Sequence, residues 1–152
     1  MKHRVYDDGT ATSSWTIDLH YPDPANSAFF PGNEFKTVCN QEYIELYPIP
    51  YRCLYSRNIS NLFMAGRNIS VSHIALGSVR VMRTTAMMGE VVGMAAWLCK
   101  IHRAIPRDIY QYRFNELKDL MKTGCGKAGL PNNQLFNIGR NASHKMKLIP
   151  QK

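Results

Sequence analysis

The chain is poor in the cysteine patterns that define small metal-binding and redox domains. Its four cysteines are widely spaced among 152 residues, and no C-x-x-C pair occurs: Cys39, Cys53, Cys99 and Cys125. This spacing argues against a zinc ribbon and against thioredoxin-like chemistry. We interpret the four as free thiols that mainly pack, and we predict no metal site.

Long hydrophobic runs are also lacking. The longest nearly apolar run, Val91 to Cys99, is too short to cross a bilayer, so no membrane span is predicted. The opening residues, MKHRVYDDGT, contain no apolar segment of the kind found in signal peptides. Neither observation assigns a compartment, and localisation is left open.

Charge is unevenly distributed. The formal net charge is +8, and residues 1–99 carry eight basic and eight acidic side chains, so the excess lies entirely in residues 100–152. Such a basic segment could bind nucleic acid or an acidic surface. However, no nucleic-acid motif accompanies it, and its tail offers only Phe136 for base stacking. A solvated tail is the favoured interpretation, and nucleic-acid binding is kept as the alternative.

The first half of the chain has the pattern of short strands and loops. Residues 15–20 alternate apolar and polar side chains, as expected for a half-buried strand that the prolines from Pro22 onward terminate. Residues 43–47 are β-prone, and Pro48 and Pro50 indicate an edge strand or extended segment. Leu62 to Ala65 predicts a short buried strand that ends at Gly66.

The second half predicts helices. Ser78 can cap a helix that begins near Val79 and runs without proline to about residue 101. Gly89, Gly93 and Ala96 form a strip of small residues along one face of this helix. Close packing of the helix on a sheet, or close contact with a cofactor, would each explain the strip. Residues 109–122 predict a second, amphipathic helix with a C-cap at Gly124.

Residues 125–152 are predicted to be an extended or disordered basic tail. Gly124 to Gly129 matches G-x-G-x-x-G, but a helix precedes it and Leu130-Pro131 follows. A dinucleotide fingerprint needs a preceding strand and a following helix, so we reject this match.

The segment from Asn61 onward resembles a known family. NLFMAGR, followed by SHIALGSVRVMRTTAMMGEVVGMAA, is similar to the C-terminal FAD-contacting segment of a bacterial family of FAD-dependent oxidoreductases, some of whose members carry a xanthan lyase label. These belong to the glutathione reductase and fumarate reductase type. TSSWTIDLHYPDP and YPIPYRCLYSRNISNL also resemble that family, and the likeness covers roughly residues 6–124.

The resemblance implies an α+β chain that contains part of an FAD/NAD(P)-binding α/β fold. Residues 1–57 would be the end of a substrate domain, and residues 58–124 the return to the FAD-binding domain. The glycine fingerprint that binds the FAD pyrophosphate is expected in a separate N-terminal Rossmann portion. Whether the chain is a fragment, a split gene product or a relic stays open.

The resemblance also implies where FAD would bind. The helix N-terminus would face the flavin pyrimidine ring, and the turn after the short strand would approach the ribityl chain. The family often has an acidic residue where this chain has Arg67, which could hold a phosphate or ribityl oxygen instead. The expected cofactor contacts are Ala65, Gly66, Arg67, Leu76, Gly77, Ser78 and Val79.

Three residues are candidates for the chemistry of a small-molecule substrate. His73 and His20 could act as general acid or base beside a hydride transfer. Arg52 could bind a substrate carboxylate. For His73, a hydrogen bond that fixes the loop is an equal explanation.

The sequence is therefore interpreted as the C-terminal segment of a flavin-dependent oxidoreductase of unknown substrate. By itself the chain is expected to be inactive and to hold FAD weakly. An apolar face on the long helix is expected to stay exposed and to favour self-association. The alternatives are a basic binding module and an inactive structural fragment.

Overall fold

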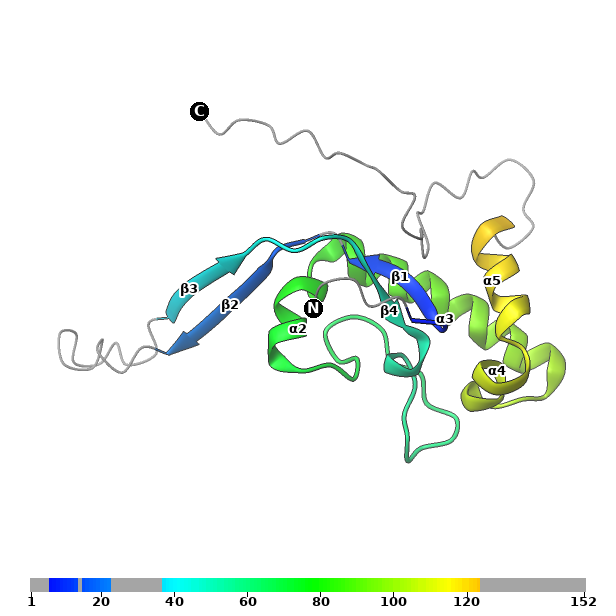
Figure 1. The fold of residues 1–152 in the computed structure, drawn as a ribbon. Helices are drawn as coiled ribbons and strands as arrows, with labels where there is room; N and C mark the ends of the chain where they lie inside the picture. Colours follow the sequence, from blue (N-terminus) through cyan, green and yellow to red (C-terminus); the bar gives the residue numbers. More distant parts are fainter. Residues whose placement is uncertain (1–5, 14, 23–36, 124–152) are drawn as a thin grey trace.

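The computed structural model describes residues 6–13, 15–22 and 37–123, which form an α+β fold (Figure 1). The elements in chain order are β1 (Gly9–Ser13), β2 (Ile17–Pro22), β3 (Thr37–Glu42), β4 (Tyr47–Pro50), the 3₁₀ helix η1 (Tyr51–Cys53), α2 (His73–Val79), α3 (Met82–His102), α4 (Pro106–Tyr112) and α5 (Phe114–Thr123). Within the described ranges the strands form two antiparallel pairs, β1–β4 and β2–β3. The β2–β3 ribbon extends away from the body, whereas α4 and α5 lie at the opposite end (Figure 1).

Strand β1 is buried along its whole length, although its sequence has no hydrophobic pattern. Its residues, GTATS, are small or polar, and every one of them is buried. It pairs with β4, and the Thr10 hydroxyl donates to the Ile49 carbonyl at 2.7 Å. The proline-containing segment therefore does form an edge strand, as predicted.

The β2–β3 ribbon is regular. Six residue pairs are in register, from Ile17 opposite Glu42 to Pro22 opposite Thr37. The predicted strand at residues 15–20 is thus confirmed with its bounds shifted by two residues. The β-prone residues 43–47 mostly lie outside strands, because β3 ends at Glu42 and β4 begins only at Tyr47.

The long helix begins later than predicted, and a separate short helix precedes it. Ser72, not Ser78, is the N-cap of α2, and its hydroxyl accepts from the Ala75 N–H at 3.3 Å. Helix α2 ends at Val79, and α3 starts at Met82. The predicted start near Val79 is therefore wrong: α2 ends with Arg80 as its C-cap, and the N-cap of α3 is Val81, which makes no side-chain capping bond.

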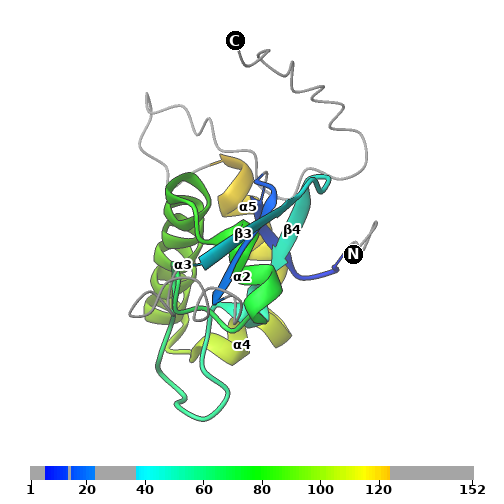
Figure 2. The ribbon, with the colours of Figure 1, turned by 90° about the vertical axis from the view of Figure 1, so that its left-hand side faces the viewer.

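Helix α3 packs one face on β1 and on the later helices. Its buried residues are Thr84, Met87, Met88, Val91, Met94, Ala95 and Leu98. Figure 2 shows α3 along one side of the molecule. The helix ends at His102, and its C-cap residue, Arg103, adopts a left-handed conformation with φ 51°. This is a common way to terminate a helix, although glycine is the usual residue.

The opposite face of α3 is exposed. A Cβ added at Gly89 or Gly93 would meet no described atom within 4 Å. Met82 and Trp97 are 88% and 50% exposed. Neither glycine packs on a sheet among the described residues, so helix–sheet packing or cofactor contact at Gly89 and Gly93 stays a prediction. Exposed Met82 and Trp97 agree with the expected apolar surface on this helix.

Two helices, not one, follow α3. Pro106 begins α4, where its missing N–H costs nothing, and the Asp108 carboxylate accepts from the Ile105 N–H at 3.1 Å. Residues 109–122 are divided at Arg113 between α4 and α5. The predicted cap at Gly124 lies outside the described residues.

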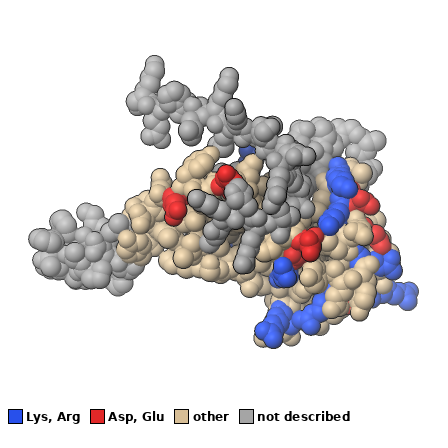
Figure 3. All heavy atoms as spheres, viewed as in Figure 1, with Lys and Arg blue, Asp and Glu red and all other residues tan. Residues whose placement is uncertain are grey.

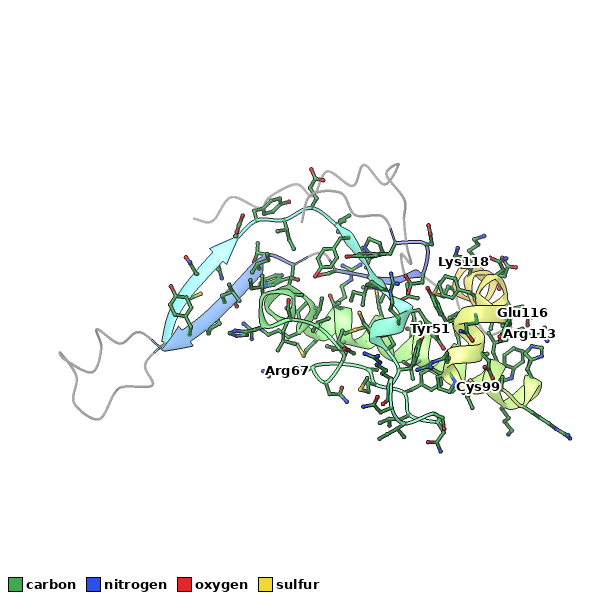
Figure 4. All side chains as sticks on the ribbon, turned by 60° about the horizontal axis from the view of Figure 1, so that its bottom comes forward. Tyr51, Arg67, Cys99, Arg113, Glu116 and Lys118 are labelled. Atoms are coloured by element: carbon green, nitrogen blue, oxygen red, sulfur yellow. The ribbon has the colours of Figure 1, made fainter. Side chains whose placement is uncertain are left out.

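Tyr51 joins these helices to the strands. Its ring is completely buried and lies 5.4 to 6.4 Å, centroid to centroid, from those of Tyr55, Phe63 and Phe114. Its hydroxyl donates to the Pro106 carbonyl at 3.0 Å, and burial raises its pKa (Figure 4). One hydrophobic cluster combines residues from β1, β4, α3, α4 and α5, on both sides of the predicted boundary at residue 57. That boundary stays a prediction.

Some charged groups on the described helices form ion pairs. Lys and Arg gather at the α4–α5 end, with acidic side chains among them (Figure 3). Arg113 lies 2.7 Å from Glu116, and Lys122 lies 3.6 Å from Asp119. The predicted basic tail, residues 125–152, lies outside the described residues. No helix within the described ranges is both long and apolar enough to span a membrane.

Candidate functional site

A tight turn at Gly66 is the first element of the candidate site. Phe63 forms a bridge with Tyr55 in place of the predicted strand, and the Met64 N–H donates to the Leu54 carbonyl at 2.8 Å. Beyond the turn, the Ser70 N–H donates to the Cys53 carbonyl at 3.0 Å. The residues around Gly66 are therefore held at both ends by backbone hydrogen bonds to the segment that follows β4.

Gly66 is required by the backbone of this turn. Its φ of +95° is in the region that side chains other than glycine rarely adopt. Among the described residues, only the Asn68 side chain lies within 4 Å of where a Cβ would be, so they leave space beside the turn. Ala65 is half-buried, whereas Arg67 is exposed and lies on the loop beside α2 (Figure 4).

The remaining predicted cofactor contacts lie in α2, and most of them are covered by this chain itself. Gly77, Ser78 and Val79 are buried, and Leu76 packs against the hydrophobic core. The Ser78 hydroxyl is 2.5 Å from the Tyr47 hydroxyl and donates to the Ala75 carbonyl at 3.0 Å. These residues form the last turn of a helix, not an open helix N-terminus.

Gly77 has a clear packing reason. A Cβ at this position would lie 2.8 Å from the Asp18 carbonyl oxygen and 3.1 Å from the Asp18 nitrogen. Both atoms belong to the backbone of β2, which cannot rotate out of the way. Glycine therefore allows α2 to lie directly on the ribbon.

The three candidate catalytic residues come from different elements. Arg52 is in η1, His73 is the first residue of α2, and His20 is in β2; all three are exposed. Within the described residues, Arg52, His73 and His20 form no hydrogen bond or ion pair with one another. His20 instead lies 3.0 Å from the Asp18 carboxylate.

Arg52 lies in a surface groove of about 530 Å³ that also reaches the Gly66 turn. Its lining residues are Arg52, Tyr55, Ser56, Arg57, Met64, Ser70, Arg107, Tyr110 and Gln111. Met64 and Ser70 flank the turn on either side. The groove thus joins one predicted catalytic candidate to the residues on either side of the turn, although Ala65, Gly66 and Arg67 are not among its lining residues.

The groove carries an excess of positive charge. Asp8 is buried, and it partly balances Arg52 through an ion pair of 3.2 Å. Arg107 donates to the Arg57 carbonyl at 2.9 Å, so a backbone bond and not a carboxylate fixes it. Arginine binds carboxylates and phosphates in paired hydrogen bonds, so this groove suits an anionic group. Arg57 and Arg107 were missed in the sequence because fifty positions separate them.

Asp18 is the centre of a second cluster, on the ribbon. The Cys39 thiol and the His20 Nε2 both lie 3.0 Å from Asp18 Oδ1, and Arg80 Nη2 lies 2.7 Å from Oδ2. The hydrogen bonds from Cys39 and His20 lower the pKa of Asp18, whereas the bond to Asp18 raises the pKa of the Cys39 thiol. Cys39 is therefore not an activated nucleophile, since the hydrogen bond to Asp18, burial and the Asp18 charge outweigh the nearby Arg80 charge and raise the pKa of the thiol.

The comparison with known families assigns the chain to one of them. The model of the family described as FAD dependent oxidoreductase matches residues 1–121, and the chain belongs to this family. Its cofactor is FAD, and the chain is accordingly a flavoprotein of the oxidoreductase class. The searches of curated proteins and of solved structures found no match.

The described residues fit FAD in part. The open turn at Gly66, with exposed Arg67 and the exposed first turn of α2, provides polar groups and a backbone that a ligand can approach. Gly77 to Val79 do not, because β2 and Tyr47 already cover them.

Proposed function

We propose that this chain supplies the flavin-ring and ribityl side of the FAD site in a flavin-dependent oxidoreductase. The observation that carries the proposal is the Gly66 turn, which is open to solvent, fixed at both ends and adjacent to an arginine-lined groove. When bound, FAD supplies the two-electron redox chemistry, and the protein supplies position and charge.

Each residue near the turn has a proposed task. Ala65 and Gly66 present backbone groups to the ribityl chain, and the missing side chain of Gly66 lets the cofactor approach closely. Arg67 holds a ribityl or phosphate oxygen with its guanidinium group. Leu76 to Val79 keep α2 seated on β2 and so position the start of that helix, and they do not touch the cofactor.

The substrate side is proposed to be the groove. Arg52, with Arg57 and Arg107, would bind an anionic group of a small-molecule substrate. His73, exposed at the start of α2, is proposed to move a proton at its imidazole during the redox step. His20 is less suited to that task, because its ring already contacts the Asp18 carboxylate.

The pyrophosphate side of the site is proposed to come from other polypeptide. Both sheets among the described residues are antiparallel pairs, whereas a dinucleotide-binding unit is built on parallel strands. The exposed strip of α3 around Gly89 and Gly93 is the surface proposed to meet that portion, or a second copy of this chain. By itself the chain would then be inactive and bind FAD weakly, since a partial site has the full cost of association.

The test is an FAD titration of the purified chain, followed by flavin fluorescence. We expect weak, saturable binding that dialysis reverses. Arg67→Ala should weaken it by about tenfold or more, since a lost charge-assisted hydrogen bond costs roughly 1.5–3 kcal/mol. Gly66→Leu should weaken it as well, because leucine is strained at a φ of +95° and its side chain fills the space at the turn. Arg83→Ala, which removes an equally exposed arginine on α3, should leave it unchanged. Equal affinity in Gly66→Leu, or no binding at saturating FAD, would contradict the proposal.

A further inference from the structure

Three side chains of metal-binding type share one face of the β2–β3 ribbon. Asp18 and His20 are two residues apart in β2, so they point to the same side of the strand. Cys39 in β3 is directly opposite His20 in the register. Residues opposite each other in an antiparallel pair have Cβ atoms about 4.5–5.5 Å apart, which brings the third group to the first two.

The ligand atoms of this trio are already close to metal-binding separation. One carboxylate oxygen, one imidazole nitrogen and the thiol sulfur all lie within 4.8 Å of one another. Tetrahedral zinc with bonds of about 2.0–2.3 Å separates its ligand atoms by roughly 3.3–3.8 Å. The Cys39 sulfur and the His20 Nε2 each lie 3.0 Å from Asp18 Oδ1, so shifts of several tenths of an ångström would open the space for an ion.

We propose that Asp18, His20 and Cys39 form a Zn²⁺ site that ties β2 to β3, with solvent as the fourth ligand. The combination of thiolate, imidazole and carboxylate selects a borderline-soft divalent ion and disfavours Mg²⁺ and Ca²⁺, which prefer all-oxygen shells. Binding replaces the two hydrogen bonds on Asp18 Oδ1 by metal bonds. The thiol proton of Cys39 passes to solvent as the sulfur coordinates the metal. His20 Nε2 gives up the hydrogen that it donates to Asp18, and the ring binds as the neutral tautomer with its proton on Nδ1.

Arg80 sets the affinity of this site. Its guanidinium group lies 2.7 Å from Asp18 Oδ2 and also 3.4 Å from the Asp18 carbonyl oxygen. It holds the carboxylate so that Oδ1 faces His20 and Cys39. Its positive charge, however, opposes a second cation a few ångströms away, which makes the site weaker than a zinc finger.

The alternative to a zinc site is a cluster of hydrogen bonds with a structural role only. The variant Arg80→Gln distinguishes these two cases. In a purely structural cluster, Arg80→Gln removes an ion pair and does nothing else. In a zinc site it removes the repelling charge, and the affinity for a divalent cation rises. This rise is predicted to be about three- to tenfold for charges roughly 6 Å apart in a polar environment.

The experiment uses the untagged, metal-free chain titrated with Co²⁺ and then with Zn²⁺. One equivalent of Co²⁺ should give a thiolate-to-cobalt charge-transfer band and intense visible bands of a tetrahedral ion, and Zn²⁺ should displace both. Zn²⁺ should also raise the melting temperature of the parent protein. Cys39→Ser should abolish the charge-transfer band, and His20→Gln should weaken binding by more than about tenfold.

Matched controls separate this site from the other thiols. Cys53→Ser changes a half-buried cysteine, and Cys125→Ser changes one outside the described residues; both should keep the full spectrum. Serine can also donate to Asp18, so Cys39→Ser should melt like the parent when no metal is present. Absence of binding at micromolar Co²⁺, a charge-transfer band that survives in Cys39→Ser, or lower affinity in Arg80→Gln would each overturn the proposal.

Discussion

Two glycines in neighbouring helices should respond in opposite ways to the addition of one methyl group. Gly77 lies in α2 against the backbone of β2, and Gly93 lies in the middle of α3 against open space. Gly77→Ala places a Cβ 2.8 Å from the Asp18 carbonyl oxygen, closer than carbon and oxygen normally approach. Gly93→Ala meets no described atom within 4 Å.

The magnitude follows from comparing the two variants. Both substitutions should stabilise the helix by about 1 kcal/mol, because alanine has a higher helix propensity than glycine. Only Gly77→Ala adds a steric cost, which is about 1–3 kcal/mol for an overpacked contact. Gly93→Ala should therefore be more stable than the parent, and Gly77→Ala should be less stable than Gly93→Ala by about 1–3 kcal/mol. For a chain of this size, each kcal/mol shifts the melting temperature by roughly 2–4 °C.

The assay is thermal and urea unfolding followed by circular dichroism, with Gly89→Ala as a second example of the open position. If Gly77→Ala is as stable as Gly93→Ala, α2 does not lie on β2 as described. If Gly93→Ala and Gly89→Ala both lower stability, the strip on α3 is covered, and its exposure in this structure is wrong.

Two further substitutions test the α4–α5 end of the molecule. Tyr51→Phe removes the 3.0 Å bond to the Pro106 carbonyl and should cost about 1 kcal/mol in a urea titration, because that buried acceptor loses its donor; an unchanged midpoint would contradict the bond. Glu116 has its pKa lowered by hydrogen bonds from Arg113 and then from His102. A carboxyl group with a depressed folded-state pKa contributes stability above its unfolded pKa of about 4.5 and loses it as pH falls through the folded value. The difference in melting temperature between the parent and Glu116→Gln should therefore be present at neutral pH and vanish in acid; a difference independent of pH would refute this.

The sequence predicted α3 well and its start poorly. A proline-free stretch of helix formers identifies a long helix whatever its surroundings. Two serines, Ser72 and Ser78, are both suitable as caps, and local preference does not choose between them. Tertiary contacts determine which serine is the cap. The Ser13 hydroxyl donates to the Ser78 carbonyl at 2.9 Å, and Ser78 lies in the last turn of α2.

Strand β1 and the ribbon cluster were missed for related reasons. The residues of β1 are too small and polar to give a hydrophobic pattern, and their burial results from α3 and β4 covering them. His20 and Cys39 are nineteen positions apart, and only the register of the ribbon makes them neighbours. The alternation of apolar and polar side chains in residues 15–20 indicated the face of the strand on which His20 lies. It did not indicate that Cys39 lies opposite His20.

The Gly66 turn, in contrast, was visible in the sequence. A glycine after a short apolar run is a recognisable turn signal, and the structure gives it a positive φ. What the sequence could not indicate is the groove beside it, because Arg52, Arg57 and Arg107 are brought together only by η1 and α4.

The most direct test of the central claim is to map ligand contacts on the chain by amide chemical shifts in NMR. If residues 65–73 form the flavin-ring and ribityl side of the FAD site, FAD and riboflavin should shift the same amides there, around Gly66 and the start of α2, whereas ADP should not. Shifts caused equally by ADP, or flavin-induced shifts confined to other parts of the chain, would contradict the account.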